Sequence, residues 1–233
     1  IIPKKNSHSK KKLTEAFSAM MSKLAYSERQ IKDTWIDEHC YAGNVLPVNS
    51  MQNDHYIKLA QFSYHVFVDG LVFVNDKERQ ILESNYGQAI PKSDYACIPF
   101  LVDFYGEDFE HHITGWYNIF VYDEVKQSHL LVNDRFGYLP LYYYDSDEYF
   151  IFSSKIEPLL ASGLMQTVAF DPVTMAEHLF FNYPLSDHTY IKQVFTLPDA
   201  SILRHNEFGL SIKRYWNVSE WFNLKPLKKK QSI

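Results

Sequence analysis

Few side chains in the sequence have the types and the spacing that catalysis or metal binding requires. His111 and His112 could ligate a metal ion, but adjacent histidines diverge in any regular element and the spacing suggests no third ligand. We interpret them as exposed loop histidines. Asp145, Asp147 and Glu148 resemble a cation-binding loop without its glycine and its terminal glutamate, so they predict a hairpin turn. The sequence therefore predicts no metal site.

Patterns for nucleophilic catalysis and phosphate binding are also missing. The sequence contains no G-x-S-x-G, no C-x-x-C, no G-x-G-x-x-G and no G-x-x-x-x-G-K-[ST]. Only 8 of the 233 residues are glycine, which leaves little room for a phosphate-binding loop. Cys40 and Cys97 cannot make a disulfide framework, and Cys97 shares a helical spacing with Phe100, Leu101 and Phe104. We expect Cys97 to be a buried structural thiol and identify no catalytic residue from these patterns.

The composition indicates a globular chain. Hydrophobic residues make up 46% of the sequence, which excludes intrinsic disorder for most of its length. Lys and Arg number 23 against 28 Asp and Glu, a formal net charge of −5 that gives no reason to expect nucleic acid as a partner. No apolar run approaches the roughly 18 residues of a membrane span, and the first residues lack the order of a signal peptide. We expect a cytoplasmic protein without a membrane partner.

The first half of the chain predicts helices around one hairpin. Apolar residues at helical spacing predict a helix over residues 13–24, with Ser9 or Thr14 as its cap, whereas residues 27–53 are irregular. Strand patterns over 64–68 and 71–74 flank Asp69-Gly70, a dipeptide typical of hairpin turns. Two further helices are expected, over 77–84 and after Ser93 or Asp94.

The second half predicts mainly antiparallel strands. Four short aromatic segments, at 116–122, 129–132, 141–144 and 149–152, are separated by turns and predict one meander. A short helix is expected over 157–161 and another after Asp171-Pro172, a cap followed by proline. A final hairpin joins 200–204 to 210–215, with Gly209 in its turn. Helices at each end of a run of antiparallel strands favour an α+β layered domain.

The best-defined segment is N-D-R-F-G-Y-L-P-L-Y-Y, at residues 133–143. Asp134 and Arg135 begin a turn that needs Gly137 at its bend, and Pro140 sets the entry to the next strand. Arg135 would serve either as an inward ion-pair partner or at an interface with another domain. The segment is therefore expected to be structural or interdomain.

This segment resembles the R-D-x-x-G-x-x-P-L-Y-Y sequence of the asparagine synthetase family, in its N-terminal class II glutamine amidotransferase domain. Other motifs follow in the family's order: G-W-Y-N-I-F-V-Y-D at 115–123, F-S-S-K-I at 152–156, T-Y through L-P-D-A at 189–200, and Y-W at 215–216. The resemblance covers about residues 13–216. It implies the fold of N-terminal-nucleophile hydrolases, a four-layer α-β-β-α sandwich of two antiparallel sheets.

The resemblance divides the chain into a basic N-terminal segment at 1–12, an amidotransferase-like domain at 13–221 and a basic, linker-like tail at 222–233. In the family, an N-terminal Cys attacks glutamine, an Asn-Gly pair stabilises the oxyanion, an early Arg binds the glutamine carboxylate and an Asp binds its ammonium. Here residue 1 is Ile, Asp69 stands in place of the Asn, and residues 44–46 contain no Arg. Only Gly70 and Asp94 match, so the resemblance implies a vestigial pocket of Asp69, Gly70 and Asp94 without catalytic residues.

These departures lead to a first hypothesis, a degenerate amidotransferase-like domain that serves as the structural or docking half of an ATP-dependent amide-forming synthetase. Beta-lactam synthetase and lasso-peptide cyclases resemble this arrangement. The S-G-G-x-D-S signature of a synthetase domain is absent, so ATP and Mg²⁺ would bind to such a domain in cis or on a separate chain, and no cofactor to this one. A homodimer is left open. The alternatives are an active glutaminase that supplies ammonia to a synthetase and a free-standing module that binds a small ligand.

Overall fold

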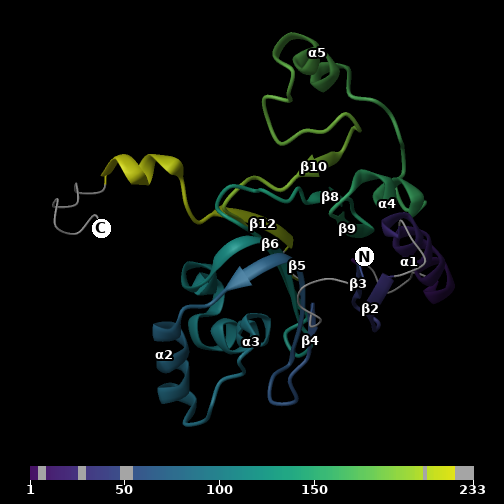
Figure 1. The fold of residues 1–233 in the computed structure, drawn as a ribbon. Helices are drawn as coiled ribbons and strands as arrows, with labels where there is room; N and C mark the ends of the chain where they lie inside the picture. The colour runs from purple at the N-terminus through teal and green to yellow at the C-terminus, as the bar shows by residue number, and fades with distance from the viewer. Residues whose placement is uncertain (5–8, 26–29, 48–54, 207–208, 224–233) are drawn as a thin grey trace.

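Two antiparallel sheets face each other in the computed structural model, which describes residues 1–4, 9–25, 30–47, 55–206 and 209–223 (Figure 1). The large sheet has the strand order β12-β11-β7-β6-β5-β4 and the small sheet the order β1-β9-β8-β10. The large sheet contains β4 (Tyr56–Ile57), β5 (Tyr64–Phe73), β6 (Thr114–Asp123), β7 (Ser128–Asn133), β11 (Ser201–Asn206) and β12 (Gly209–Arg214). The small sheet contains β1 (Ile2–Pro3), β8 (Tyr142–Asp145), β9 (Tyr149–Ser153) and β10 (Val194–Thr196).

Helices cover the outer face of each sheet. Beneath the large sheet lie α2 (Asp76–Tyr86), α3 (Asp94–Tyr105) and the 3₁₀ helix η1 (Gly106–His112), which bury Leu82, Leu101 and Phe109 in one core with Val68. On the small sheet lie α1 (Lys10–Leu24) and α4 (Ile156–Ala161), whose apolar side chains form a second core with its strands.

A third core lies between the sheets. Phe67 and Phe120 of the large sheet meet Tyr143 and Phe150 of the small one there. Successive side chains of a strand point to opposite faces, so β5 sends Phe67 to this inner core and Val68 to the helices. The three cores separate four layers, and the predicted α-β-β-α sandwich is confirmed.

Most predicted helices are confirmed, because their signals are local. The Asp171-Pro172 pair begins α5 (Pro172–Phe181), where the Asp171 carboxylate accepts a hydrogen bond from the Val173 amide at 3.1 Å. Ser93 precedes α3 as predicted, without a side-chain capping bond. Cys97 is fully buried on α3, as expected of a structural thiol. No described helix reaches the length and apolarity needed to span a membrane.

The predicted hairpin turn at Asp69-Gly70 is wrong. Both residues lie within β5, which pairs with β6 without interruption from Tyr64 to Phe73. Gly70 has φ +101°, and a Cβ atom there would lie 2.0 Å from the carbonyl oxygen of Trp116. The glycine therefore permits the close approach of a neighbouring strand, and ten paired residues outweigh the local turn preference of the dipeptide.

The single meander is also wrong. β6 and β7 pair in the large sheet, whereas β8 and β9 pair in the small sheet, and residues 134–141 cross between the two. Alternating aromatic patterns predict strands but do not say which sheet a strand joins.

A hairpin occupies part of the stretch that the sequence left unassigned. β2 (Gln30–Ile36) pairs with β3 (Tyr41–Pro47), and the Asp37 carboxylate closes the turn by accepting the amides of His39 and Cys40 at 2.7 and 2.6 Å. The predicted final hairpin is present as β11 and β12, and its turn residues 207–208 lie outside the described residues. Much of both predicted basic ends, 5–8 and 224–233, lies outside them as well.

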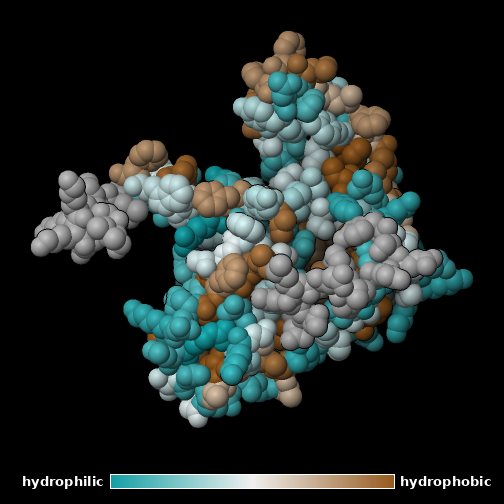
Figure 2. Space-filling model, viewed as in Figure 1, coloured by the Kyte–Doolittle hydropathy of each residue, from teal (hydrophilic) through white to brown (hydrophobic). Residues whose placement is uncertain are grey.

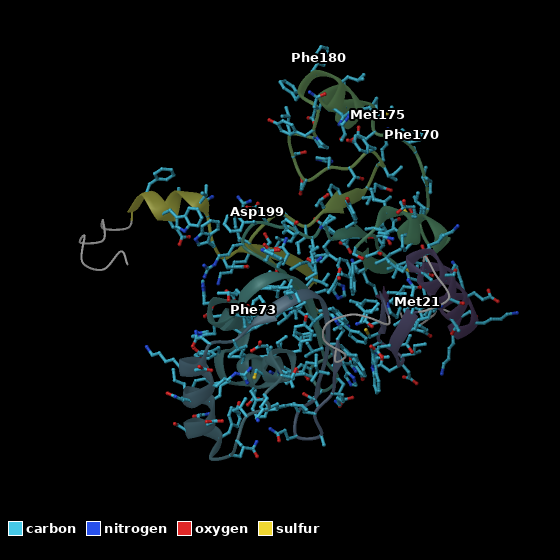
Figure 3. The ribbon with its side chains drawn as sticks, in the orientation of Figure 1. Met21, Phe73, Phe170, Met175, Phe180 and Asp199 are labelled. Atoms are coloured by element: carbon cyan, nitrogen blue, oxygen red, sulfur yellow. The ribbon has the colours of Figure 1, made fainter. Side chains whose placement is uncertain are left out.

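The segment around α5 stands away from the sandwich (Figure 1). Of the helix residues only Thr174 is buried, whereas Leu179 and Phe180 are 82% and 83% exposed. Hydrophobic atoms are visible across this projection in Figure 2, and Figure 3 labels Phe170, Met175 and Phe180 on it. We call residues 168–190 the α5 projection. The 3₁₀ helix η2 (Val218–Asn223) extends from another side of the molecule.

Candidate functional site

A polar row crosses the inner face of the large sheet. Strand pairing places Asp69 of β5 opposite Asn118 of β6, and Asn118 opposite Asn133 of β7. The residue two positions before Asp69 is Phe67, which belongs to the inner core, so alternation along β5 directs Asp69 toward the small sheet. The register, rather than proximity in sequence, brings these three polar side chains together.

The first two members of this row line a cavity of about 130 Å³ between the sheets. Its wall is mostly apolar and includes Phe17, Met20, Met21, Phe67, Phe120 and Leu141. Met21 comes from α1 and is labelled in Figure 3. Polar groups reach the cavity from Asp69, Asn118, Asn44 on β3, and Ser153 and Ser154 at the end of β9. A small site with a few convergent polar groups in an apolar wall is typical of a ligand pocket.

Hydrogen-bond acceptors dominate the polar side of this cavity. Asn118 donates its amide NH₂ to the carbonyl oxygen of Leu139 at 3.3 Å, and Asn44 donates to that of His55 at 3.3 Å. The side-chain oxygens of both asparagines are buried without a hydrogen-bond partner among the described residues. Asp69 adds a carboxylate, whose pKa is raised by burial and lowered less by nearby His55. The site therefore offers three side-chain acceptors to a ligand that can donate.

Asp94 lies outside the cavity lining and is already paired. Its carboxylate accepts the Val74 amide at 3.0 Å and forms an ion pair with Arg79 of α2 at 2.5 Å. Arg79 also donates to the carbonyl oxygen of Pro91 and to the Cys97 sulfur, so it joins α2 to the start of α3. Burial, as the largest effect, raises the pKa of the Cys97 thiol to about 11. These contacts hold two helices together.

Gly70 contributes a carbonyl oxygen to the helix side of the sheet, where it accepts the Tyr95 hydroxyl at 2.5 Å. Of the vestigial pocket predicted from the sequence, the structure thus brings Asp69 to the cavity and leaves Asp94 at the start of α3. No sequence pattern points to Asn118 or Asn44 as site residues. Asn118 lies within the G-W-Y-N motif, but only the strand register shows that it neighbours Asp69.

The segment from Asp134 to Pro140 forms a loop organised by one carboxylate. The buried Asp134 carboxylate accepts hydrogen bonds from the backbone amides of Phe136 and Tyr138, at 2.9 and 3.1 Å. The backbone carbonyl oxygen of Asp134 accepts a third hydrogen bond, from the amide of Gly137 at 3.0 Å. Gly137 has φ +57°, and a Cβ atom there would lie 3.3 Å from the Cα of Asp199. The loop holds the side chains of Phe136 and Tyr138 outward, with 59% and 67% of their surface exposed.

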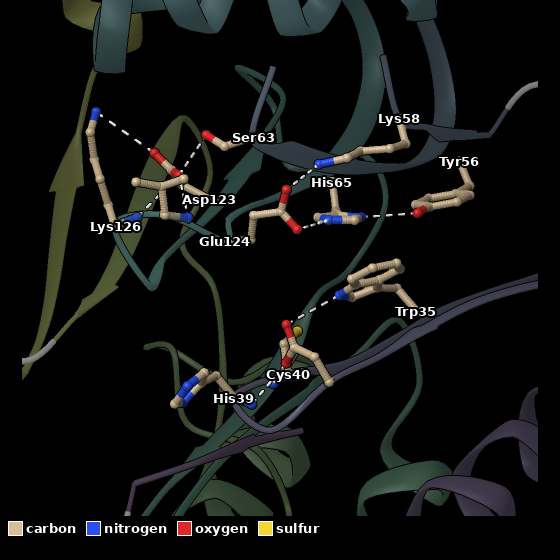
Figure 4. Close-up of polar contacts among 12 residues, drawn as sticks. Trp35, His39, Cys40, Tyr56, Lys58, Ser63, His65, Asp123, Glu124 and Lys126 are labelled. Carbon is tan, nitrogen blue, oxygen red and sulfur yellow. Dashed lines mark hydrogen bonds and ion pairs between the residues drawn. The ribbon is translucent and has the colours of Figure 1, made fainter. Parts of the chain in front are cut away.

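A second polar network lies at the outer edge of the large sheet (Figure 4). The His65 ring contacts the Tyr56 hydroxyl at 2.9 Å and Glu124 at 3.0 Å, and Glu124 pairs with Lys58 at 2.7 Å. Trp35 stacks on His65 at 3.8 Å. Burial, as the largest effect, raises the pKa of Tyr56 and lowers that of His65, so both groups favour their neutral forms. This network fastens β2 and β4 to β5.

A family assignment follows from comparison with known proteins. The glutamine amidotransferase domain family matches residues 4–216, which is nearly the whole chain. The chain belongs to this family.

Curated relatives of this amidotransferase domain are longer proteins. Asparagine synthetase [glutamine-hydrolyzing] 3 of Bacillus subtilis is 26% identical over 157 residues, covering 67% of this chain and 25% of that protein. Amidase chry2 of Gibberella zeae is 21% identical over 160 residues, covering 66% and 24%. The amidotransferase domain therefore spans about a quarter of the length of the curated relatives it matches.

Among solved structures, one similar to this domain is glutamine phosphoribosylpyrophosphate amidotransferase from B. subtilis complexed with ADP and GMP. The sequences are 14% identical, the TM-score is 0.49, and the match covers 75% of this chain and 34% of that one.

Proposed function

We propose that this amidotransferase domain does not hydrolyse glutamine and is the docking half of an ATP-dependent, amide-forming synthetase similar to asparagine synthetase. The observation that carries the proposal is the excess of acceptors in the inter-sheet cavity, namely Asp69, Asn44 and Asn118. The similarity to asparagine synthetase supports the choice of partner.

Glutamine hydrolysis passes through a tetrahedral intermediate whose oxygen gains negative charge. Preorganised N–H donors directed at that oxygen stabilise it, and removing one such donor costs about 10²–10³ in kcat. Asp69 brings a carboxylate to the cavity instead, and the amide NH₂ of Asn118 is engaged by backbone carbonyl oxygens. A negative charge that developed here would be repelled.

Binding of glutamine itself would also lack the counter-charges that the family resemblance implies. Among the described residues that line the cavity there is no Arg or Lys to bind a carboxylate. Asp94, which the family resemblance assigns to the ammonium, is neutralised by Arg79 instead. The carboxylate of a glutamine zwitterion would therefore be unpaired, and its ammonium would not be bound by Asp94.

Two exposed apolar surfaces support a docking role. The first, which we call the aromatic surface, comprises Trp116, Phe136, Tyr138, Trp221 and Phe222. Trp116 stacks on Tyr138 at 5.3 Å, and Phe136 lies 5.8 Å from Trp221. The second is the α5 projection. Exposed patches of this kind mark protein interfaces, and aromatic residues dominate the energy of such interfaces. We propose that the synthetase domain covers them and supplies the ATP and Mg²⁺ sites.

The test of the catalytic part is ammonia release from glutamine by the full-length gene product, with the synthetase substrates present. We expect none above the uncatalysed rate, and none from Asp69→Asn, because that change alone restores neither a carboxylate clamp nor a free Asp94. Ammonia release that is abolished by alkylating an N-terminal cysteine would overturn the proposal and favour an active glutaminase.

The test of the docking part is association of this chain with the synthetase domain, expressed as a separate polypeptide. We expect Trp116→Ser and Phe180→Ser to weaken binding at least about tenfold, as loss of an aromatic anchor does. Val125→Ser is the matched control, because Val125 is 78% exposed in the turn between β6 and β7, outside both surfaces. Unchanged affinity in both aromatic variants would contradict docking.

The cavity also favours a second candidate, a small-ligand-binding module. Its apolar wall and three acceptors fit a small apolar molecule with an amino or hydroxyl group. A thermal-shift screen of short alkylamines and alcohols would test this, with Asn118→Leu as the variant expected to abolish the shift.

A further inference from the structure

One carboxylate outside the cavity has an unusual environment. Glu110, in η1, has a side chain with no exposed surface, and neither of its oxygens has a hydrogen-bond partner among the described residues. Buried charged groups are normally paired or bind a metal, because desolvating an unpaired charge is costly. The carboxylate is therefore buried without a hydrogen bond, and its ion-pair partner among the described residues is the His111 ring.

Two metal-ligating side chains lie beside Glu110. Asp108, Glu110 and His111 each offer one possible ligand atom, and these three atoms all lie within 4.8 Å of one another. The His111 Nε2 atom is 3.3 Å from Glu110 Oε1, in a geometry that makes no hydrogen bond. Two atoms that each lie about 2.0–2.1 Å from a tetrahedral Zn²⁺ are separated by about 3.3 Å, so this pair already matches one edge of such a site.

We propose that Asp108, Glu110 and His111 bind one divalent transition-metal ion, of which Zn²⁺ fits best, at the η1 turn. Imidazole with carboxylates suits zinc, whereas Mg²⁺ and Ca²⁺ prefer oxygen ligands alone. Three protein ligands leave a fourth position for water. The sequence interpretation of His111 as a loop histidine found no third ligand, because the carboxylates come together only through the 3₁₀ turn.

The surroundings leave the exposed ligands free to rearrange. Asp108 contacts the Lys213 ammonium at 3.6 Å, and both side chains are 66% exposed, so this ion pair is weak and a metal ion would displace it. His111 is 49% exposed and lies edge-on to the Tyr215 ring at 5.9 Å. Glu110 would form the buried base of the site and the other two ligands its outer side.

His112 provides a matched control. It is the neighbouring histidine, but it contacts Glu78 of α2 at 3.1 Å and stacks on Tyr105 at 3.5 Å. Its ring is therefore committed to another cluster, and replacing it should leave the proposed metal site intact.

The experiment is calorimetric titration of the whole chain with Zn²⁺, with thermal unfolding measured in parallel. We expect one strong site per chain, a rise in Tm with Zn²⁺, and no competition from excess Mg²⁺ or Ca²⁺. His111→Gln and Asp108→Asn change exposed side chains and should each weaken this site at least about tenfold, whereas His112→Gln should not.

Co²⁺ provides a second measurement, because a tetrahedral N/O site gives visible absorption bands that His111→Gln should abolish and His112→Gln retain. Absence of a strong site in the parent chain would overturn the proposal. So would equal zinc affinity in the parent chain, His111→Gln and Asp108→Asn, since the ion would then bind elsewhere. Glu110→Gln is informative if its thermal unfolding without metal shows a folded protein, and it should then lose the site.

Discussion

Acid should destabilise this protein through a histidine buried between the sheets. His129 of β7 is 3% exposed, and neither ring nitrogen has a hydrogen-bond partner among the described residues. Its ring stacks on Tyr122 at 4.8 Å and on Phe120 at 6.1 Å. Burial, reinforced by the nearby His205 ring, lowers the pKa of His129 to about 3. The imidazole is therefore neutral in the folded protein at all moderate pH values.

The sign and size of the effect follow from linkage. In the unfolded chain a histidine has a pKa of about 6.5, so below that pH the unfolded state binds a proton that the folded state does not. The part of the stability that depends on a neutral His129 is therefore fully present above about pH 6.5, and it decreases as the pH drops toward the folded-state pKa of about 3. At pH 5 the solution is about 1.5 pH units below the unfolded-state pKa of the histidine. At about 1.36 kcal/mol per unit, His129 lowers the free energy of unfolding by about 2 kcal/mol.

The perturbation is His129→Phe, which keeps a flat ring between Phe120 and Tyr122 and removes the titrating group. Urea unfolding, followed by tryptophan fluorescence at pH 7.5 and pH 5, measures the free energy of unfolding of each protein. We expect the parent chain to lose about 2 kcal/mol more than His129→Phe between the two pH values. Other titrating groups are shared, so their contributions largely cancel in this difference.

His188→Gln is the control, because His188 is an exposed histidine outside the inter-sheet core. It should lose as much stability in acid as the parent chain. An equal loss in the parent chain and in His129→Phe would refute the reasoning, since the buried ring would then carry no part of the acid sensitivity.

Three further changes test the contacts that shape the fold, each measured as a free energy of unfolding. Gly70→Ala should destabilise the protein by at least about 2 kcal/mol, because the new Cβ atom would meet the backbone of β6. Gly163→Ala is the control, since Gly163 also has a positive φ of +63° but has open space around it, and it should cost about 1 kcal/mol. Equal costs of the two changes would contradict the role of this backbone contact. Arg79→Met leaves the Asp94 carboxylate without its cation and should cost about 1–3 kcal/mol; no loss would show that the ion pair is dispensable. Asp134→Ala should cost about 2–3 kcal/mol by removing the acceptor of two loop amides, and a loss below about 0.5 kcal/mol would argue against that role.

Sequence and structure agree where the forces are local. The Asp171-Pro172 cap predicts the start of α5, because a carboxylate beside free amides and a proline at the first helical position act within one turn. The loop from Asp134 to Pro140 can also be predicted from the sequence, because a carboxylate and a glycine with positive φ within the loop itself determine its conformation.

The same local signals fail where distant segments compete. Asp69-Gly70 has the composition of a turn, but β6 lies alongside and extends the strand through it. Asp37 closes a hairpin that no pattern revealed, because its function depends on the positions of the His39 and Cys40 amides. A local preference worth a few tenths of a kcal/mol is outweighed when a whole ladder of strand hydrogen bonds opposes it.

The sequence by itself thus determined the helices, the strand-rich class and the loop motif of this protein, because capping, periodicity and turn chemistry operate between neighbouring residues. Only the tertiary structure decided which sheet each strand joins and which polar groups meet. Asp69, Asn118 and Asn44 line one cavity through strand register and the packing of β3, and Glu110 loses its solvent through the folding of η1 against the large sheet. Burial and register are properties of the assembled layers, and these two properties convert ordinary polar residues into candidate sites.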